Sequence, residues 1–333
     1  MNEWRPDKLA LRLPNLQARA RLQSSIRQWF VDEGFVEVET PILQVSPGAE
    51  VHLSGFATDW ETPDGEEEEE VRWLHSSPEF AMKKLLAGGM PKIFQFARVF
   101  RNAEGSALHH PEFTMLEWYR AKAGYEALMA DCAALLALTG VRALRWDGNV
   151  CDPAATPERL TVAEAFDRHA GVDLLAAVGN AELLAKQADI AMHAGDSWDD
   201  VFFRVMFDRI EPRLGMGRPT ILYEYPISMA ALARAKPDDP RVAERFELYV
   251  CGVELANAFG ELTDPAIQRA RLQADMDEKE RLYGLRWPID ADFLAAVDHG
   301  LPASSGIALG FDRLVMLATG ARHIEDVLWL PVR

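Results

Sequence analysis

The chain has 333 residues, with 52 Asp and Glu against 35 Lys and Arg, so its formal net charge is −17. Such an acidic balance disfavours a protein whose whole surface binds nucleic-acid phosphate. The three cysteines (Cys132, Cys151 and Cys251) lack the spacing of metal ligands, which predicts reduced thiols without a zinc site. We find neither a signal peptide nor an apolar run of ~18 residues. We therefore expect a cytoplasmic protein that does not contact membranes.

A helix is predicted near the N-terminus, where apolar residues recur at helical spacing (Leu16, Leu22, Ile26, Trp29 and Phe30). Only about thirteen residues precede it. The segment Gly34-Phe35-Val36-Glu37-Val38-Glu39-Thr40-Pro41 follows. Further along, residues 59–70 (DWETPDGEEEEE) predict a solvated acidic loop, and an electrostatic contact for a partner is the alternative interpretation.

Residues 98–119 (RVFRNAEGSALHHPEFTMLEWY) predict two strands around a polar loop. The period of two puts Phe113, Met115, Glu117 and Tyr119 on one face of the second strand. An aromatic ring can stack on a base, Arg101 can bind a phosphate, and a semi-buried carboxylate can hold an ammonium group. The pattern favours a site for ATP and an amine-bearing substrate; the alternative is a solvated hairpin with surface charges and a core of aromatic rings.

Residues 122–216 are rich in Ala and Leu at helical spacing, for example Val201 with Val205, and predict core and insertion helices. Residues 245–264 (RFELYVCGVELANAFGELTD) predict a hairpin. If Cys251 and Gly252 form its two-residue turn, Val250 faces Val253, Tyr249 faces Glu254 and Leu248 faces Leu255. Glu247 and Glu254 then share one face, and such paired oxygen ligands suit Mg²⁺. A solvated polar face is the alternative.

Near the C-terminus, Gly306-Ile307-Ala308-Leu309-Gly310-Phe311-Asp312-Arg313-Leu314 predicts a strand of small residues that turns into a helix. Arg313 falls in the first helical turn. A helix N-terminus favours anions, and a guanidinium fixed there can reach the outermost phosphate of a nucleotide.

Together these blocks resemble the class II aminoacyl-tRNA synthetases. Residues 98–119 closely resemble motif 2 in its lysine-type version, residues 34–41 resemble motif 1, and residues 306–314 resemble motif 3. The resemblance runs in the family order from about residue 14 to the end. It implies an α/β (α+β) catalytic domain with a mostly antiparallel sheet flanked by helices, spanning residues 1–333 with a helical insertion at about 125–235. It also implies a homodimer built on motif 1.

The resemblance implies roles residue by residue. Arg101 would bind the α-phosphate of ATP, Arg313 the γ-phosphate, and Phe113 would stack under adenine. Glu247 and Glu254 would hold Mg²⁺, and Arg101, Arg313 and Glu254 would carry catalysis. Other residues expected around the nucleotide are Asn102, Ala103, His109, His110, Leu248 and Gly310. The expected amino-acid pocket comprises Ser77, Pro78, Glu79, Glu117, Tyr119, Glu254, Asn257, Glu261 and Ala308, with Glu79 on the amino group and Glu117 and Glu261 toward a distal ammonium.

The chain also departs from the family pattern at a few positions. Ala103 stands where motif 2 usually has Glu, although Glu104 is adjacent. His110 replaces an asparagine, Leu108 an arginine, and Ala258 a glycine. These departures concern the loop contacts rather than Arg101, Phe113 or the carboxylates.

Two features indicate which branch of the family the chain resembles: the expected lack of one domain and two residues of the expected amino-acid pocket. We expect no anticodon-binding domain, and the chain then resembles the freestanding ligases that attach (R)-β-lysine to elongation factor P. Those ligases carry serine and alanine at Ser77 and Ala308, where lysyl-tRNA synthetases carry alanine and glycine. The Ala308 methyl takes volume where the α-amino group of α-lysine would sit.

The expected activity is therefore ATP-dependent activation of (R)-β-lysine, or of lysine, and transfer to a lysine ε-amine of elongation factor P, with tRNA not expected as a partner. One alternative is a truncated synthetase that charges tRNA or a small molecule with lysine. Another is a non-catalytic binding module, which is disfavoured because the residues expected to bind ATP and metal are all in place.

Overall fold

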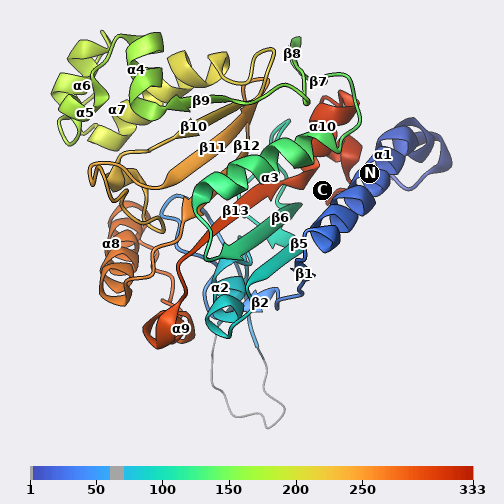
Figure 1. The fold of residues 1–333 in the computed structure, drawn as a ribbon, viewed down its shortest axis with the longest axis horizontal. Coiled ribbons are helices and arrows are strands. Elements are labelled where there is room, and N and C mark those ends of the chain that lie inside the picture. The colour runs from blue at the N-terminus through green and yellow to red at the C-terminus, as the bar shows by residue number, and fades with distance from the viewer. Residues whose placement is uncertain (1–2, 61–70, 333) are drawn as a thin grey trace. The chain divides into compact units, whose positions relative to one another are not determined.

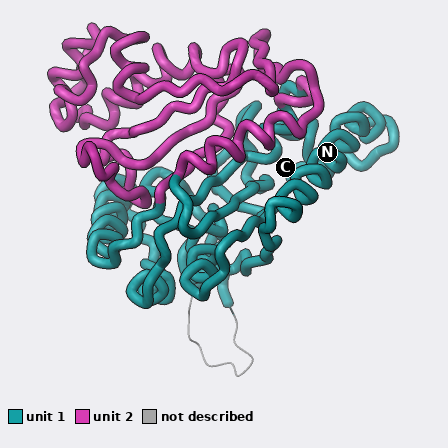
Figure 2. Tube along the Cα trace, in the orientation of Figure 1, with its two compact units in different colours: residues 1–124, 261–316, 321–333 teal, residues 125–260, 317–320 magenta. Residues whose placement is uncertain are grey.

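A computed structural model describes residues 3–60 and 71–332 (Figure 1). The chain divides into unit 1, with residues 1–124, 261–316 and 321–333, and unit 2, with residues 125–260 and 317–320 (Figure 2). The expectation of a single domain over 1–333 stays a prediction, and the acidic loop expected at 59–70 lies mostly outside the described residues. No helix in the described ranges is long and apolar enough to cross a membrane.

Unit 1 is built on four strands in the order β1, β5, β6, β13. The pair β1–β5 is parallel, whereas β5–β6 and β6–β13 are antiparallel. A small second sheet has the order β2, β4, β3. The strand bounds are β1 Val36–Glu37, β2 Leu43–Gln44, β3 Phe56–Thr58, β4 Arg72–Leu74, β5 Lys92–Phe100, β6 Glu112–Ala121 and β13 Ser304–Gly310.

The first helix of unit 1 is longer than expected. It begins at Pro6, so the prediction that about thirteen residues precede it is wrong. Proline suits the first helical turn, and the helix continues through Pro14 because Arg12 anchors it, donating to the Leu328 carbonyl oxygen at 2.7 Å. The helices are α1 Pro6–Asp32, α2 Glu79–Ala87, α8 Pro265–Tyr283, α9 Ala291–Gly300, α10 Phe311–Thr319, whose last residues belong to unit 2, and the 3₁₀ turn Ile324–Val327.

A buried ion pair joins three of these elements. The guanidinium of Arg19 on α1 bonds to the carboxylate of Asp312 at the start of α10, and both side chains are almost fully buried. Arg19 also donates to the Thr114 hydroxyl on β6 at 2.8 Å, and Asp312 accepts the Thr114 backbone N–H at 2.7 Å. The helix that precedes the motif 1 segment, the second strand of the motif 2 segment and the helix of the motif 3 segment are therefore held at one point.

Unit 2 contributes strands in the order β12, β11, β10, β9, of which only β9–β10 is parallel. The strand bounds are β7 Leu144–Trp146, β8 Asn149–Cys151, β9 Glu158–Thr161, β10 Thr220–Tyr223, β11 Arg245–Val250 and β12 Val253–Gly260. The helices are α3 Tyr125–Ala137, α4 Val162–Ala170, α5 Leu174–Ala177, α6 Ala181–Gln187 and α7 Trp198–Val205, followed by a π-helical turn at Met206–Ile210 and 3₁₀ turns at Glu211–Arg213 and Ile227–Met229. All three cysteines are free thiols, and all three are buried.

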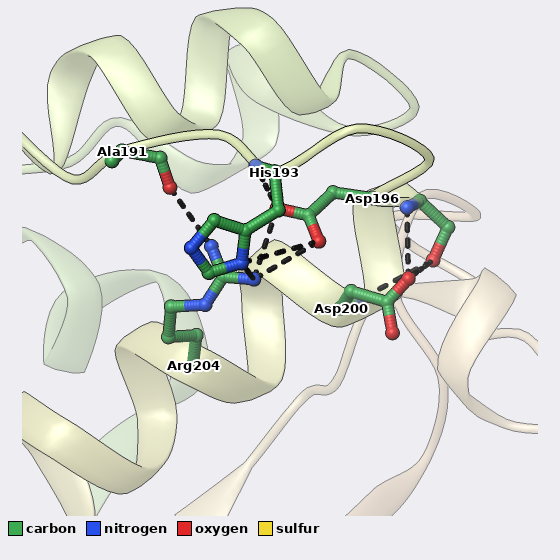
Figure 3. Close-up of polar contacts among 6 residues, drawn as sticks. Ala191, His193, Asp196, Asp200 and Arg204 are labelled. Atoms are coloured by element: carbon green, nitrogen blue, oxygen red, sulfur yellow. Dashed lines mark hydrogen bonds and ion pairs between the residues drawn. The ribbon is translucent and has the colours of Figure 1, made fainter.

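The start of α7 shows how the sequence sets a helix in unit 2. Ser197 and Asp200 form a capping box, in which each side chain accepts the backbone N–H of the other residue. From the last turn, Arg204 donates to both carboxylate oxygens of Asp196 at 3.0 and 2.9 Å and to the Ala191 carbonyl oxygen at 2.9 Å (Figure 3). The preceding loop is thereby fastened to the helix, and the helical spacing of Val201 and Val205 is confirmed.

The hairpin of β11 and β12 has the expected two-residue turn. Cys251 and Gly252 both have positive φ (55° and 78°), as a type I′ turn requires. Val250 pairs with Val253 and Tyr249 with Glu254, as predicted. The expected pairing of Leu248 with Leu255 is wrong, because a bulge at Leu255 pairs Leu248 with Ala256. Beyond the bulge Glu247 pairs with Asn257, so the bulge brings Asn257 onto the face of Glu254.

We predict that Asp312→Ala lowers the free energy of unfolding by about 3–5 kcal/mol, because Arg19 is left as a buried charge without its counter-ion. Urea denaturation measures the loss. The double variant Arg19→Met/Asp312→Leu, which removes both charges, should unfold close to the wild type. A double variant as unstable as the single one would contradict the ion-pair explanation.

Candidate active site

The Arg101 side chain lies against the aromatic ring expected to receive adenine. Arg101 follows β5 directly, and its backbone N–H donates to the Pro111 carbonyl oxygen at 2.9 Å, which closes the motif 2 loop. The guanidinium carbon lies 5.3 Å from the centroid of the Phe113 ring. The buried Arg101 Nε has no hydrogen-bond partner among the described residues. An unused donor in this position suits an anionic ligand.

Arg313 contacts the same loop from the first turn of α10. Its Nη2 lies 2.7 Å from His109 Nε2, and its Nε donates to the Leu108 carbonyl oxygen at 3.4 Å. Because a guanidinium only donates, His109 Nε2 must accept, and the ring proton is on Nδ1, which donates to the Ser106 hydroxyl at 2.7 Å. Burial, and then the positive charge of Arg313, lower the pKa of His109 and favour this neutral form.

The other loop residues are placed mainly by backbone contacts. Asn102 pairs with Ser54 through its backbone N–H (2.8 Å), and Ala103 adopts a positive φ of 61°. The buried His110 lies within hydrogen-bond distance of the carbonyl oxygens of Glu112 (2.6 Å) and Val332 (3.1 Å), so its ring fastens the loop to the C-terminal segment. Beside the loop is a cavity of about 360 Å³ whose polar lining includes Asn102, Glu104 and His109.

A second group of polar side chains in unit 1 lies just before α2, on α2, on β6 and just after β12. We call it the acid cluster and define it as Ser77, Glu79, Lys83, Glu117, Tyr119 and Glu261. In it, the Ser77 hydroxyl donates to Glu117 Oε1 at 2.5 Å and accepts the Glu79 backbone N–H at 3.0 Å. The Tyr119 hydroxyl donates to Glu117 Oε2 at 3.1 Å. Ala308 on β13 pairs with Glu117 and therefore shares its face of the sheet.

Glu117 is electrostatically unusual. Burial, and then the nearby carboxylate of Glu79, raise its pKa to about 8, although the hydrogen bonds from Ser77 and Tyr119 and the charge of Lys83 act the other way. At neutral pH this carboxyl is therefore held mainly in its protonated form. A ligand ammonium would favour the carboxylate and release the proton.

Sequence reasoning missed Lys83. Its ammonium is buried and forms ion pairs with Glu79 and, at 2.6 Å, with Glu261. Two adjacent lysines on a helix look like a solvated pair, and only the spacing of four residues from Glu79 hints at a contact. Glu79 and Glu261 were expected to bind substrate ammonium groups, and the structure shows both already paired with a resident ammonium.

In unit 2 the two expected metal ligands, Glu247 and Glu254, have different surroundings. Glu247 Oε2 accepts the hydroxyls of Tyr225 (2.5 Å) and Tyr249 (2.7 Å), and Oε1 accepts Arg245 Nη2 at 2.6 Å. Glu254 is half-buried on the same face, and Asn257 Oδ1 accepts Arg245 Nε at 3.2 Å. Leu248 is buried on the opposite face, so only its backbone remains available to a ligand.

These contacts decide how a magnesium ion would fit. A carboxylate offers about four acceptor positions, and three donors already occupy Glu247, which leaves it one contact at most. Within the described residues, no group of three or more His, Cys, Asp or Glu side chains forms a metal site. The donor set therefore fits an ion that brings most of its ligands with it, as Mg²⁺ bound to nucleotide phosphates does.

Comparison with known proteins gives a family and close relatives. The family model for class II tRNA synthetases (D, K and N) matches residues 11–333. A protein named elongation factor P–(R)-beta-lysine ligase from Histophilus somni is 40% identical over 328 residues, which cover 98% of this chain and 96% of that protein. Proteins of the same name are 40% identical in Haemophilus influenzae (100% and 98% covered) and 42% identical in Klebsiella pneumoniae (99% and 97% covered).

The pKa of Glu117 predicts pH-dependent binding of a diamine amino acid such as lysine. Its affinity should rise by up to roughly tenfold per unit as the pH increases from 6.5 toward 8, and then level off, because only the ionised carboxylate attracts an ammonium. Isothermal titration calorimetry measures the trend. Glu117→Gln should bind weakly with a flat profile, and a flat profile in the wild type would refute the assignment.

Proposed function

This chain belongs to the class II tRNA synthetases of the D, K and N group, alongside the elongation factor P–(R)-beta-lysine ligases, and we propose that it activates (R)-β-lysine with ATP and transfers it to a lysine side chain of elongation factor P. The acceptor is proposed from the relatives' name and from the extent of the similarity. Elongation factor P works in translation, so we place the reaction in the cytoplasm.

The acid cluster carries the proposal. It contains three carboxylates, of Glu79, Glu117 and Glu261, and one ammonium, of Lys83. An amino acid with two ammonium groups brings the number of positive charges to three and balances the carboxylates once Glu117 has lost its proton. A substrate with a single ammonium leaves the Glu117 carboxyl protonated and forms no ion pair with it, so it uses less of the cluster than a diamine does. The cluster therefore supports a diamine substrate such as β-lysine.

The reaction follows from the substrates and needs no protein nucleophile. The amino-acid carboxylate attacks the α-phosphorus of ATP, pyrophosphate leaves, and an acyl-adenylate forms. The unprotonated acceptor amine then attacks the acyl carbon and AMP leaves. We propose that Arg101 stabilises charge on the α-phosphate and Arg313 on the γ-phosphate, with Phe113 under adenine. The neutral ring of His109 accepts a hydrogen bond from Arg313 and so holds the guanidinium in position. No residue is assigned as the base for the acceptor amine.

We propose that Glu254, with one contact from Glu247, holds Mg²⁺. When bound, the ion would neutralise charge on the phosphates. Arg245, Tyr225 and Tyr249 keep Glu247 fixed, and burial together with the charge of Glu247 raises the pKa of Tyr225 well above its usual range. The tyrosine hydroxyls therefore remain donors. The expected roles of Asn257, Leu248 and Gly310 stay predictions.

We further propose a homodimer through the segment that resembles motif 1. Large apolar side chains are exposed in this segment and on either side of it: Val36 lies within it and Val31, Ile42 and Leu43 flank it, and they expose between 39% and 57% of their surface. A run of exposed apolar residues of this kind marks an interaction surface. Sedimentation velocity tests the dimer, and a monomer at micromolar concentration would contradict it.

The first experiment is amino-acid-dependent exchange between ATP and pyrophosphate, followed by transfer of labelled amino acid to purified elongation factor P or to tRNA. We expect activation of (R)-β-lysine and label on the protein. Activation of α-lysine with label on tRNA would favour the truncated synthetase, and no activation would favour the binding module.

Glu254→Ala should abolish exchange between ATP and pyrophosphate while the thermal unfolding midpoint is kept. Exchange retained in that variant would contradict the assignment of Glu254 as a metal ligand.

A second prediction concerns Ala308. Ala308→Gly should shift the ratio of kcat/KM values by about tenfold toward α-lysine, because one methyl group less leaves room for the α-amino group of α-lysine. Ala97→Gly is the matched control: it removes a methyl from the same apolar cluster, but its strand neighbour is Met115 rather than Glu117. Equal ratios in both variants would show that the methyl of Ala308 does not set the preference.

A further inference from the structure

Lys279 on α8 is a buried cation that binds the backbone of a loop. Only 2% of its surface is exposed. Its ammonium donates to three carbonyl oxygens, those of Glu50 (3.2 Å), Val51 (2.8 Å) and Leu53 (2.6 Å). The ammonium also lies 3.6 Å from the centroid of the Trp287 ring. An ammonium has three N–H donors, so all of them are used here, and the face of the aromatic ring further stabilises the buried charge.

The loop that Lys279 binds connects β2 to β3 and comprises residues 45–55; we call it the β2–β3 loop. Within residues 50–55 no side chain is buried: His52 and Ser54 are exposed and the others are half-buried. A cavity of about 370 Å³ is lined both by this part of the loop and by Lys279. Side-chain packing therefore holds residues 50–55 only weakly, and the hydrogen bonds from Lys279 to their backbone fix their position.

The β2–β3 loop in turn contacts the motif 2 loop. The Ser54 carbonyl oxygen accepts the backbone N–H of Asn102 at 2.8 Å, and the Asn102 side-chain amide donates to the Gly55 carbonyl oxygen at 3.5 Å. Leu53, whose carbonyl oxygen binds Lys279, directly precedes Ser54. Asn102 is expected beside the nucleotide, and it directly follows the arginine proposed to bind the α-phosphate. A continuous series of contacts thus leads from α8 to the expected ATP site.

We propose that Lys279 is a positioning residue of the ATP site: by binding the backbone of the β2–β3 loop, it fixes the partner of Asn102 and so holds the start of the motif 2 loop where the nucleotide binds. The inference rests on the proposed function and deepens it, because it adds to the ATP site a residue that acts through the loop and not on the nucleotide itself.

The kinetic test compares Lys279→Met with Arg281→Met by pyrophosphate exchange. We expect Lys279→Met to raise KM for ATP at least roughly fivefold, because the loop loses three hydrogen bonds, while KM for the amino acid stays within about twofold. Arg281 is the matched control: it lies on the same helix, carries the same charge, exposes 65% of its side chain and pairs with Glu278. Its variant should keep both KM values within about twofold of the wild type.

The split between KM and kcat separates positioning from a general loss of stability. A smaller folded fraction lowers the apparent kcat, whereas KM for ATP is a property of the molecules that are folded. Equal KM values for ATP in Lys279→Met and Arg281→Met would therefore overturn the proposal.

Hydrogen–deuterium exchange tests the positioning without any activity. The backbone amide of Asn102 should exchange roughly tenfold faster in Lys279→Met than in Arg281→Met, because the Ser54 carbonyl oxygen is no longer held in place. The amide of Arg101 donates within the motif 2 hairpin and should exchange equally in both variants. Equal exchange of Asn102 in the two variants would contradict the proposal. A wild type that is inactive with every amino acid would refute the proposed function instead, and the exchange comparison would still stand.

A milder variant covers the case in which Lys279→Met does not fold. In Lys279→Gln the side chain keeps two N–H donors and is one bond shorter, so it cannot serve all three carbonyl oxygens. We expect KM for ATP to rise about threefold relative to Arg281→Gln, because part of the loop's hydrogen bonding is lost. No rise relative to that control would overturn the proposal.

Discussion

The buried ion pair between Arg19 and Asp312 is the constraint on which unit 1 depends. It connects the first helix, the second strand of the motif 2 hairpin and the last helix through contacts to Thr114. Arg19 also lies 4.9 Å from the ring of Phe311. Asp312 directly precedes Arg313, so the interaction that fixes the start of α10 also fixes the guanidinium that contacts His109. A structural charge and a proposed catalytic charge thus share one helical turn.

The acid cluster shows a different use of buried charge. At the ion pair, two opposite charges are satisfied within the protein. In the acid cluster, three carboxyl groups lie near one ammonium, and burial together with the carboxylate of Glu79 raises the pKa of Glu117 to about 8. The strongly negative net charge of the chain has little influence on the acid cluster, because the charges of the cluster are buried.

Sequence patterns predicted the family and fold class, and both are confirmed by the match over residues 11–333. The face that carries Phe113, Met115, Glu117 and Tyr119 is also confirmed, because β6 is long, regular and paired on both sides. The register of β12 was right only up to Glu254. Leu255 and Ala256 are both apolar and buried, so nothing in their pattern marks the bulge between them.

Two further features could not be predicted from sequence patterns, for physical reasons. The start of α1 was misplaced because Pro14 argues for a helix boundary, and only tertiary contacts such as those of Arg12 show that the helix continues. Lys83 and Lys84 are adjacent and chemically identical, and burial alone separates a resident ammonium from a peripheral one. The roles of the individual site residues remain predictions, because they concern ligands rather than the fold.

The two carboxylates of the β11–β12 hairpin also show that a sequence pattern does not reveal how many hydrogen bonds a side chain already accepts. In sequence they look like an equivalent pair, seven residues apart across a turn. In the structure, Glu247 accepts two tyrosine hydroxyls and an arginine, while Glu254 pairs across the strands with Tyr249, which binds Glu247. A carboxylate held by three donors keeps its position but has little capacity left for a metal. Glu247 is therefore the fixed side chain of this hairpin, and in the proposed Mg²⁺ site it would contribute one contact at most.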